Sequence, residues 1–142
     1  MELNNDNLKL VEKEIQRIFP NIHIQLPLNK EKKEDYNIAI FLSKKSLTDY
    51  IDNYDSEDYI INQINSGEWF FSKSVCYPGV RMRADGTGEP DMWDIEDSEE
   101  KFKTWETAIL GVVKDYMDSI FDQLLMSIEH DLPQEISSLK EI

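Results

Sequence analysis

The sequence is poor in the residues that build disulfides and zinc sites. It has one cysteine, Cys76, and two histidines, His23 and His130, in 142 residues. A lone cysteine cannot form an internal disulfide, so we expect the protein to work in a reducing, intracellular compartment. Three potential ligands of these types are also too few for an ordinary four-ligand zinc site.

Long apolar runs and phosphate-binding motifs are missing as well. No stretch of 18 apolar residues is present, which argues against a membrane span, and the polar segment Met1–Leu10 predicts no secretory signal. We therefore expect a cytoplasmic protein, or a virion protein if it is an assembly subunit. Neither GxGxxG nor GxxxxGK[ST] occurs. Gly86 and Gly88 stand among acidic residues, where they predict a turn.

Positive charge is scarce. The chain carries 15 Lys and Arg against 29 Asp and Glu, a formal net charge of −14. The excess lies beyond residue 45, since residues 1–45 hold eight basic and seven acidic residues. A protein this acidic repels phosphate groups, so we expect no direct nucleic-acid partner and no membrane partner. A basic protein partner is the functional interpretation, and the alternative is that the charge only keeps the protein soluble.

The first half of the chain predicts a helix, a hairpin and more helix. A one-sided apolar stripe over residues 8–19 indicates a helix, which Pro20 ends. Apolar and polar residues then alternate over 22–26 and again over 36–42, as in two antiparallel strands joined by a short loop. Residues 46–66 show helical spacing, and whether they form one bent helix or two is open.

The second half predicts strands and then the longest helix. Residues 69–77 and 80–84 alternate as strands, and a last short strand is expected over 91–96. Helical spacing then continues from Ser98 to His130. Its predicted buried face comprises Trp105, Ile109, Val112, Tyr116, Ile120 and Leu124. A helix this long overshoots a small sheet, so part of it should pack on the first helix, the chain terminus or another subunit.

These elements predict one acidic α+β domain over residues 1–142. Its order is α-β-β-α-β-β(-β)-α, an antiparallel sheet of four to five strands with helices on one face. The hydrophobic content of 40% and aromatic content of 11% are enough for a real core.

The strongest candidate for a functional surface is the acidic stretch between Asp85 and Glu106. It holds nine carboxylates against Lys101 and Lys103, and Trp93 stands inside it. An aromatic anchor ringed by carboxylates suits protein binding, although Trp93 could equally fold over its own hairpin. The expected partner-binding residues are Asp85, Glu89, Asp91, Trp93, Asp94, Glu96 and Asp97.

Catalysis is not expected, and no catalytic residue, metal or cofactor is assigned. Pro90-Asp91 followed by Glu99-Glu100-Lys101 matches the letters of some metal-dependent nucleases. Their carboxylates belong on adjacent strands, however, whereas Glu99 is expected to begin a helix. Neither His23 nor His130 has a nearby Ser or Cys in a recognised nucleophile setting, and Cys76 is more typical of a small core residue.

The sequence is compatible with three hypotheses about function. The leading hypothesis is a non-enzymatic interaction domain that presents an acidic, aromatic-centred surface to a basic protein, as inhibitors, immunity proteins and phage counter-defence proteins do. The second is an assembly subunit, such as a phage head–tail ring or connector component, that works as a homo-oligomer. The third is a divalent-metal-dependent enzyme that uses the carboxylates of residues 85–106.

Overall fold

A computed structural model describes residues 1–27, 36–53, 57–77 and 92–130. The chain divides into two compact units, Met1–Ile109 and Leu110–Ile142. The first unit contains the whole sheet, and the described part of the second is helical. The expectation of one domain over residues 1–142 stays a prediction.

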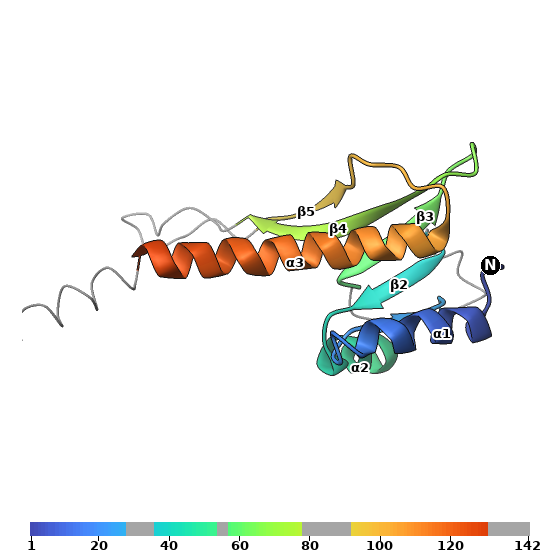
Figure 1. Cartoon of the computed structure of the whole chain (residues 1–142), viewed down its shortest axis with the longest axis horizontal. Coiled ribbons are helices and arrows are strands. Elements are labelled where there is room, and N and C mark those ends of the chain that lie inside the picture. The colour runs from blue at the N-terminus through green and yellow to red at the C-terminus, as the bar shows by residue number, and fades with distance from the viewer. Residues whose placement is uncertain (28–35, 54–56, 78–91, 131–142) are drawn as a thin grey trace, which may run out of the picture. The chain divides into compact units, whose positions relative to one another are not determined.

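The first unit is built on a five-stranded antiparallel sheet in which every strand lies beside its neighbours in sequence (Figure 1). The expected α+β class, element order and long C-terminal helix are confirmed. The strands are β1 (His23–Gln25), β2 (Ile38–Phe41), β3 (Tyr59–Gln63), β4 (Trp69–Tyr77) and β5 (Met92–Asp97). The helices are α1 (Asn5–Gln16), α2 (Lys44–Asn53) and α3 (Trp105–His130).

Strand β3 corrects the expectation of helix over residues 46–66. Only Lys44–Asn53 is helical, and Ile61 of β3 pairs with Ile38 of β2 and Phe71 of β4. Ile60 and Ile61 are β-branched and suit a pleated, packed surface. Gly67, at φ 91°, lies in the turn between β3 and β4 and does not end a helix. The strand expected over 80–84 lies outside the described residues.

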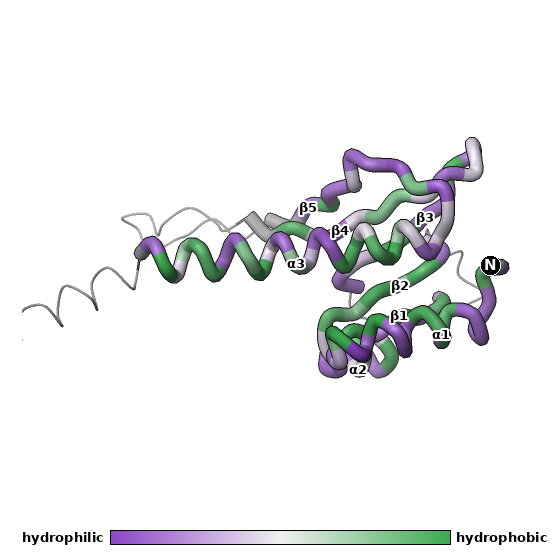
Figure 2. Tube along the Cα trace, viewed as in Figure 1, coloured by the Kyte–Doolittle hydropathy of each residue, from purple (hydrophilic) through white to green (hydrophobic). Residues whose placement is uncertain are grey.

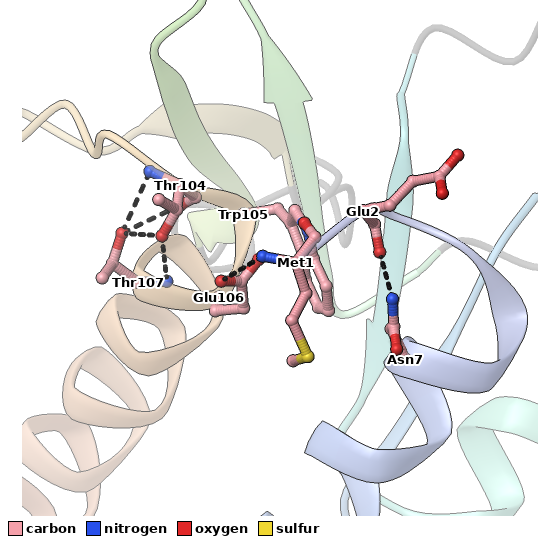
Figure 3. Close-up of polar contacts among 7 residues, drawn as sticks. All are labelled: Met1, Glu2, Asn7, Thr104, Trp105, Glu106 and Thr107. Atoms are coloured by element: carbon pink, nitrogen blue, oxygen red, sulfur yellow. Dashed lines mark hydrogen bonds and ion pairs between the residues drawn. The ribbon is translucent and has the colours of Figure 1, made fainter.

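The long helix begins later than expected, at Trp105 rather than at Ser98. Phe102 pairs with Trp69 instead, through backbone hydrogen bonds of 2.7 and 2.8 Å. Thr104 then caps the helix, because its Oγ1 accepts from the Thr107 N–H at 3.2 Å and its own N–H donates to Thr107 Oγ1 at 3.3 Å (Figure 3). The helix has 26 residues and is about 39 Å long at 1.5 Å per residue.

The core uses both faces of the sheet. All four residues of β2 are buried, and successive strand residues point to opposite faces. Helix α2 covers the face that bears Phe41, whose ring centroid lies 5.0 Å from that of Tyr50. Ile38 and Ile40, on the other face, are equally buried. Helix α2 thus forms a layer on the face of β2 that bears Phe41.

Helix α3 carries apolar side chains beyond those it buries. Trp105, Ile109 and Val112 are buried as expected. The continuation of that stripe is exposed in the single chain, since Ile120 is 43% and Leu124 54% exposed, and its burial against another subunit stays a prediction. Apolar residues nevertheless recur to the end of the helix (Figure 2). Of the helices described, none is both long enough and apolar enough to cross a membrane.

Candidate functional site

The structure places four of the seven candidate residues together on strand β5. Trp93, Asp94, Glu96 and Asp97 all belong to it, and the backbone of Trp93 pairs with that of Cys76 in β4. The other three, Asp85, Glu89 and Asp91, lie outside the described residues, so their place in the site stays a prediction.

Strand β5 is the last strand in the order of the sheet. Its register sets Asp94 opposite Val75, Ile95 opposite Ser74 and Glu96 opposite Lys73. Because side chains alternate along a strand, Asp94 and Glu96 share one face while Ile95 and Asp97 share the other. Negative charge therefore borders this end of the sheet on both faces.

Asp94, Glu96 and Asp97 are all exposed, but their local contacts differ. Asp97 Oδ1 accepts a hydrogen bond of 2.6 Å from the hydroxyl of Ser72, which is only 3% exposed. Asp94 Oδ1 accepts from the N–H of Ile95 at 2.8 Å. Asp97 thus supports the packing of β4 against β5, and Asp94 and Glu96 are the better probes of an external contact.

Ile95 is the residue of this strand that sequence reasoning missed. Its side chain is 66% exposed, although it is large and apolar. It borders a shallow depression of about 130 Å³, which is lined by Glu57, Ile60, Ser72, Lys73, Ser74 and Ile95. The depression has room for one small side chain and is well below the usual size of a cofactor pocket. The available signal was an apolar residue set directly between acids, Asp94 and Glu96.

A buried tyrosine pair holds Glu57 beside this depression. The hydroxyls of Tyr36 and Tyr50 lie 2.6 Å apart, and Tyr36 donates to Glu57 Oε1 at 2.8 Å. Burial, and then the hydrogen bonds to Tyr50 and Glu57, raise the pKa of Tyr36 far above its ordinary value. A phenol held this firmly in its protonated form is a poor acid or base near neutral pH. The group therefore serves the fold, and it fixes one wall of the depression.

Glu106, the last acid of the stretch, contacts the N-terminal residue instead of joining the β5 surface. Its Oε2 lies 3.6 Å from the amino nitrogen of Met1, and Trp105 Nε1 donates to the Met1 carbonyl at 3.0 Å (Figure 3). These contacts attach the first turn of α3 to the segment that precedes α1. Glu99 and Glu100, by contrast, are exposed and precede α3 rather than forming its first turn.

The residues considered for catalysis come from separate elements. His23 belongs to β1, Cys76 to β4, and His130 is the last residue of α3. Across the described residues, no three His, Cys, Asp or Glu side chains gather into a group that could hold a metal ion. Asp91, on which the nuclease-like letter pattern depends, is outside those residues, so the metal hypothesis is not tested.

Comparisons with known proteins give no match. No protein-family model, no curated protein and no solved structure matches this chain. The remaining guide to function is the surface around β5. It combines an exposed apolar side chain, flanking carboxylates and a small adjacent depression.

Proposed function

We propose that this protein is a non-enzymatic interaction domain that binds a basic protein through the surface around β5. The observation that carries the proposal is the exposed Ile95, 66% accessible, on a strand with exposed carboxylates on both faces, Asp97 on the face of Ile95 and Asp94 and Glu96 on the other. An apolar contact at the centre with charge at the rim is the usual composition of a protein interface.

The two components have different tasks. Burying Ile95 against a partner supplies affinity, at about 25 cal/mol for each Å² of apolar surface removed from water. The carboxylates attract a partner of opposite charge over longer distances and so raise the association rate. The net charge of −14 extends this attraction well beyond the strand.

This mode of binding suits a protein that must capture its target quickly, such as an inhibitor, an immunity protein or a phage counter-defence protein. The alternative function, a subunit of a larger assembly, requires a surface for self-association. The surface best suited to that lies on α3, not on β5.

The test is partner capture with matched charge variants. The wild-type chain and the variant Asp94→Lys/Glu96→Lys serve as baits in the native cell, and captured proteins are identified by mass. The control is Asp52→Lys/Glu68→Lys, which changes the net charge equally at exposed positions on α2 and in the β3–β4 turn.

We expect a basic protein on the wild-type and control baits and its loss from the β5 variant. With the purified partner, association should slow and its salt dependence should flatten for the β5 variant alone. Equal capture and equal association rates for all three baits would contradict the proposal.

A further inference from the structure

A second surface of the described residues, on the later part of α3, is apolar and exposed. Seven of its large apolar side chains, spread over Leu110–Ile128, are between 39% and 59% exposed. We propose that this segment pairs with the same segment of a second copy of the chain in an antiparallel two-helix coiled coil. The inference is independent of the β5 surface.

The spacing of these side chains is that of a coiled-coil seam. Leu110, Met117 and Leu124 are seven residues apart, and Phe121 and Ile128 complete the alternation of three and four. Ile120 and Leu125 flank the seam on either side. A seven-residue repeat keeps one stripe facing a partner helix along its whole length.

The polar residues keep the same repeat on another side of the helix. Asp115, Asp122 and Glu129 are also seven residues apart. At about 100° per residue they lie roughly a third of a turn from the seam, where a two-stranded coil leaves side chains in water. Apolar and acidic residues that both recur every seven residues are expected of a helix that pairs with another helix along its length.

The seam is also distinct from the side of α3 that is already buried. Trp105, Ile109 and Val112 are at most 3% exposed. Helical geometry places them roughly a third of a turn from Leu110 and Met117. Covering one side of the helix therefore leaves the seam available.

The exposed apolar area approaches the area that a stable pair buries. Seven side chains of about 200 Å², each about half exposed, offer roughly 700 Å² of apolar surface. A stable protein–protein contact buries about 800 Å² on each partner, and the largest apolar patch of an ordinary monomer is about 300–600 Å². The segment thus matches the requirement of a dimer better than that of a free surface.

Lys114 decides the orientation. It is the one charged residue in the seam, at the position between Leu110 and Met117. A parallel pair in register would set the two Lys114 ammonium groups against each other. An antiparallel pair with Met117 opposite Phe121 sets each Lys114 against the partner's Leu124, about 15 Å along the axis from the other lysine. The lysine stem can then cover the leucine while its ammonium group reaches water.

The charge of the segment favours a second copy over a membrane surface. Leu110–Glu129 carries four acidic residues and one lysine, Lys114. An amphipathic helix that lies on an anionic membrane has basic residues on its polar face. In the proposed pair, the stripe of Asp115, Asp122 and Glu129 lies away from the seam, Asp118 flanks the seam seven residues before Leu125, and all four charges are screened at physiological salt. We therefore expect self-association to strengthen as salt rises.

The first experiment is sedimentation of the full chain over a range of concentrations. Wild type is expected to dimerise, and Phe121→Asp/Leu124→Asp to remain monomeric with an unchanged melting temperature for the sheet unit. The control is Met126→Asp, at a 60% exposed position outside the seam, which should dimerise like wild type. A wild-type monomer at every concentration would overturn the proposal, as would binding of that monomer to vesicles of zwitterionic or anionic lipid.

Orientation is tested by cross-linking on a Cys76→Ser background. Leu110→Cys mixed with Ile128→Cys should form a disulfide between the two variants, because the antiparallel pair sets these positions opposite each other. Each variant alone should not cross-link. A disulfide between two copies of Leu110→Cys would show a parallel pair and contradict the assignment.

Discussion

The hydroxyl of Tyr36 is a buried polar group with two hydrogen-bond partners. It donates to Glu57 and lies 2.6 Å from the Tyr50 hydroxyl, in a side chain that is only 9% exposed. Its pKa is raised in the folded protein above the unfolded value of about 10. The folded state therefore holds this proton more tightly than the unfolded state. Its contribution to stability is complete below about pH 10 and is lost as the pH rises beyond that.

Replacing this residue tests that account. We expect Tyr36→Phe to lower the free energy of unfolding at neutral pH by about 1 kcal/mol, because Tyr50 and Glu57 each lose a hydrogen-bond partner. The variant should also lose less stability than wild type between about pH 9 and pH 11. Urea unfolding across that range measures both effects. If the free energy of unfolding falls equally with pH in both proteins, Tyr36 is not the cause of the stability loss at high pH.

At the scale of elements, the alternation of apolar and polar residues correctly predicted four of the five described strands. The hairpin of β1 and β2 and the strands β4 and β5 are confirmed. Strand β3 was misassigned because Tyr59, Ile60, Ile61 and Ile64 also fit a helical spacing. Burial alternates along β3, but its first three residues are all large and apolar, and so short an apolar run cannot be distinguished from a helix by period alone.

The start of α3 was misplaced for a related reason. Phe102 fits the helical spacing, but its backbone pairs with Trp69, which is a long-range contact that local spacing does not reveal. Thr104 and Thr107 make the actual cap. The acidic pair Glu99 and Glu100, which suggested a first turn, belongs to the preceding segment.

The cap can be tested directly. Thr104→Ala removes the acceptor of the Thr107 N–H and should lower the free energy of unfolding by about 1 kcal/mol. Thr104→Ser keeps the hydroxyl and should stay within a few tenths of a kcal/mol of wild type. Denaturant unfolding followed by circular dichroism compares the three proteins. Equal losses for both variants would mean that the threonine methyl group, not the hydroxyl, stabilises this end of the helix.

At the scale of the whole molecule, the two proposed surfaces respond to salt in opposite directions. Binding of a basic partner at β5 weakens as salt screens the attraction, whereas pairing of two acidic α3 segments strengthens as salt screens the repulsion. The two proposals can therefore fail separately. A chain that dimerises but captures no basic protein would favour the assembly hypothesis over the inhibitor-like one.

The non-enzymatic proposal also makes a prediction for the whole chain. His23, Cys76 and His130 belong to different elements. We expect the triple variant His23→Ala/Cys76→Ala/His130→Ala to keep partner binding and biological function within a few-fold, provided that it melts like wild type. Activity in the native cell is the measurement. A loss beyond about a hundredfold in the folded variant would correspond to nearly 3 kcal/mol and would indicate catalysis.

The sequence by itself determined the α+β class, the acidic character, the order of elements and the placing of three candidate residues, Trp93, Asp94 and Glu96, on one strand. These follow from composition and from local periodicity, which any chain segment displays without reference to the rest. Only the tertiary structure decided that Ile95 is exposed beside a depression, that Asp97 supports Ser72, and that Glu106 contacts Met1. It also decided that the apolar residues of α3 divide into a buried side and an uncovered seam. Burial and strand pairing depend on which segments, far apart in the sequence, contact each other. The local spacing of apolar residues does not reveal those contacts.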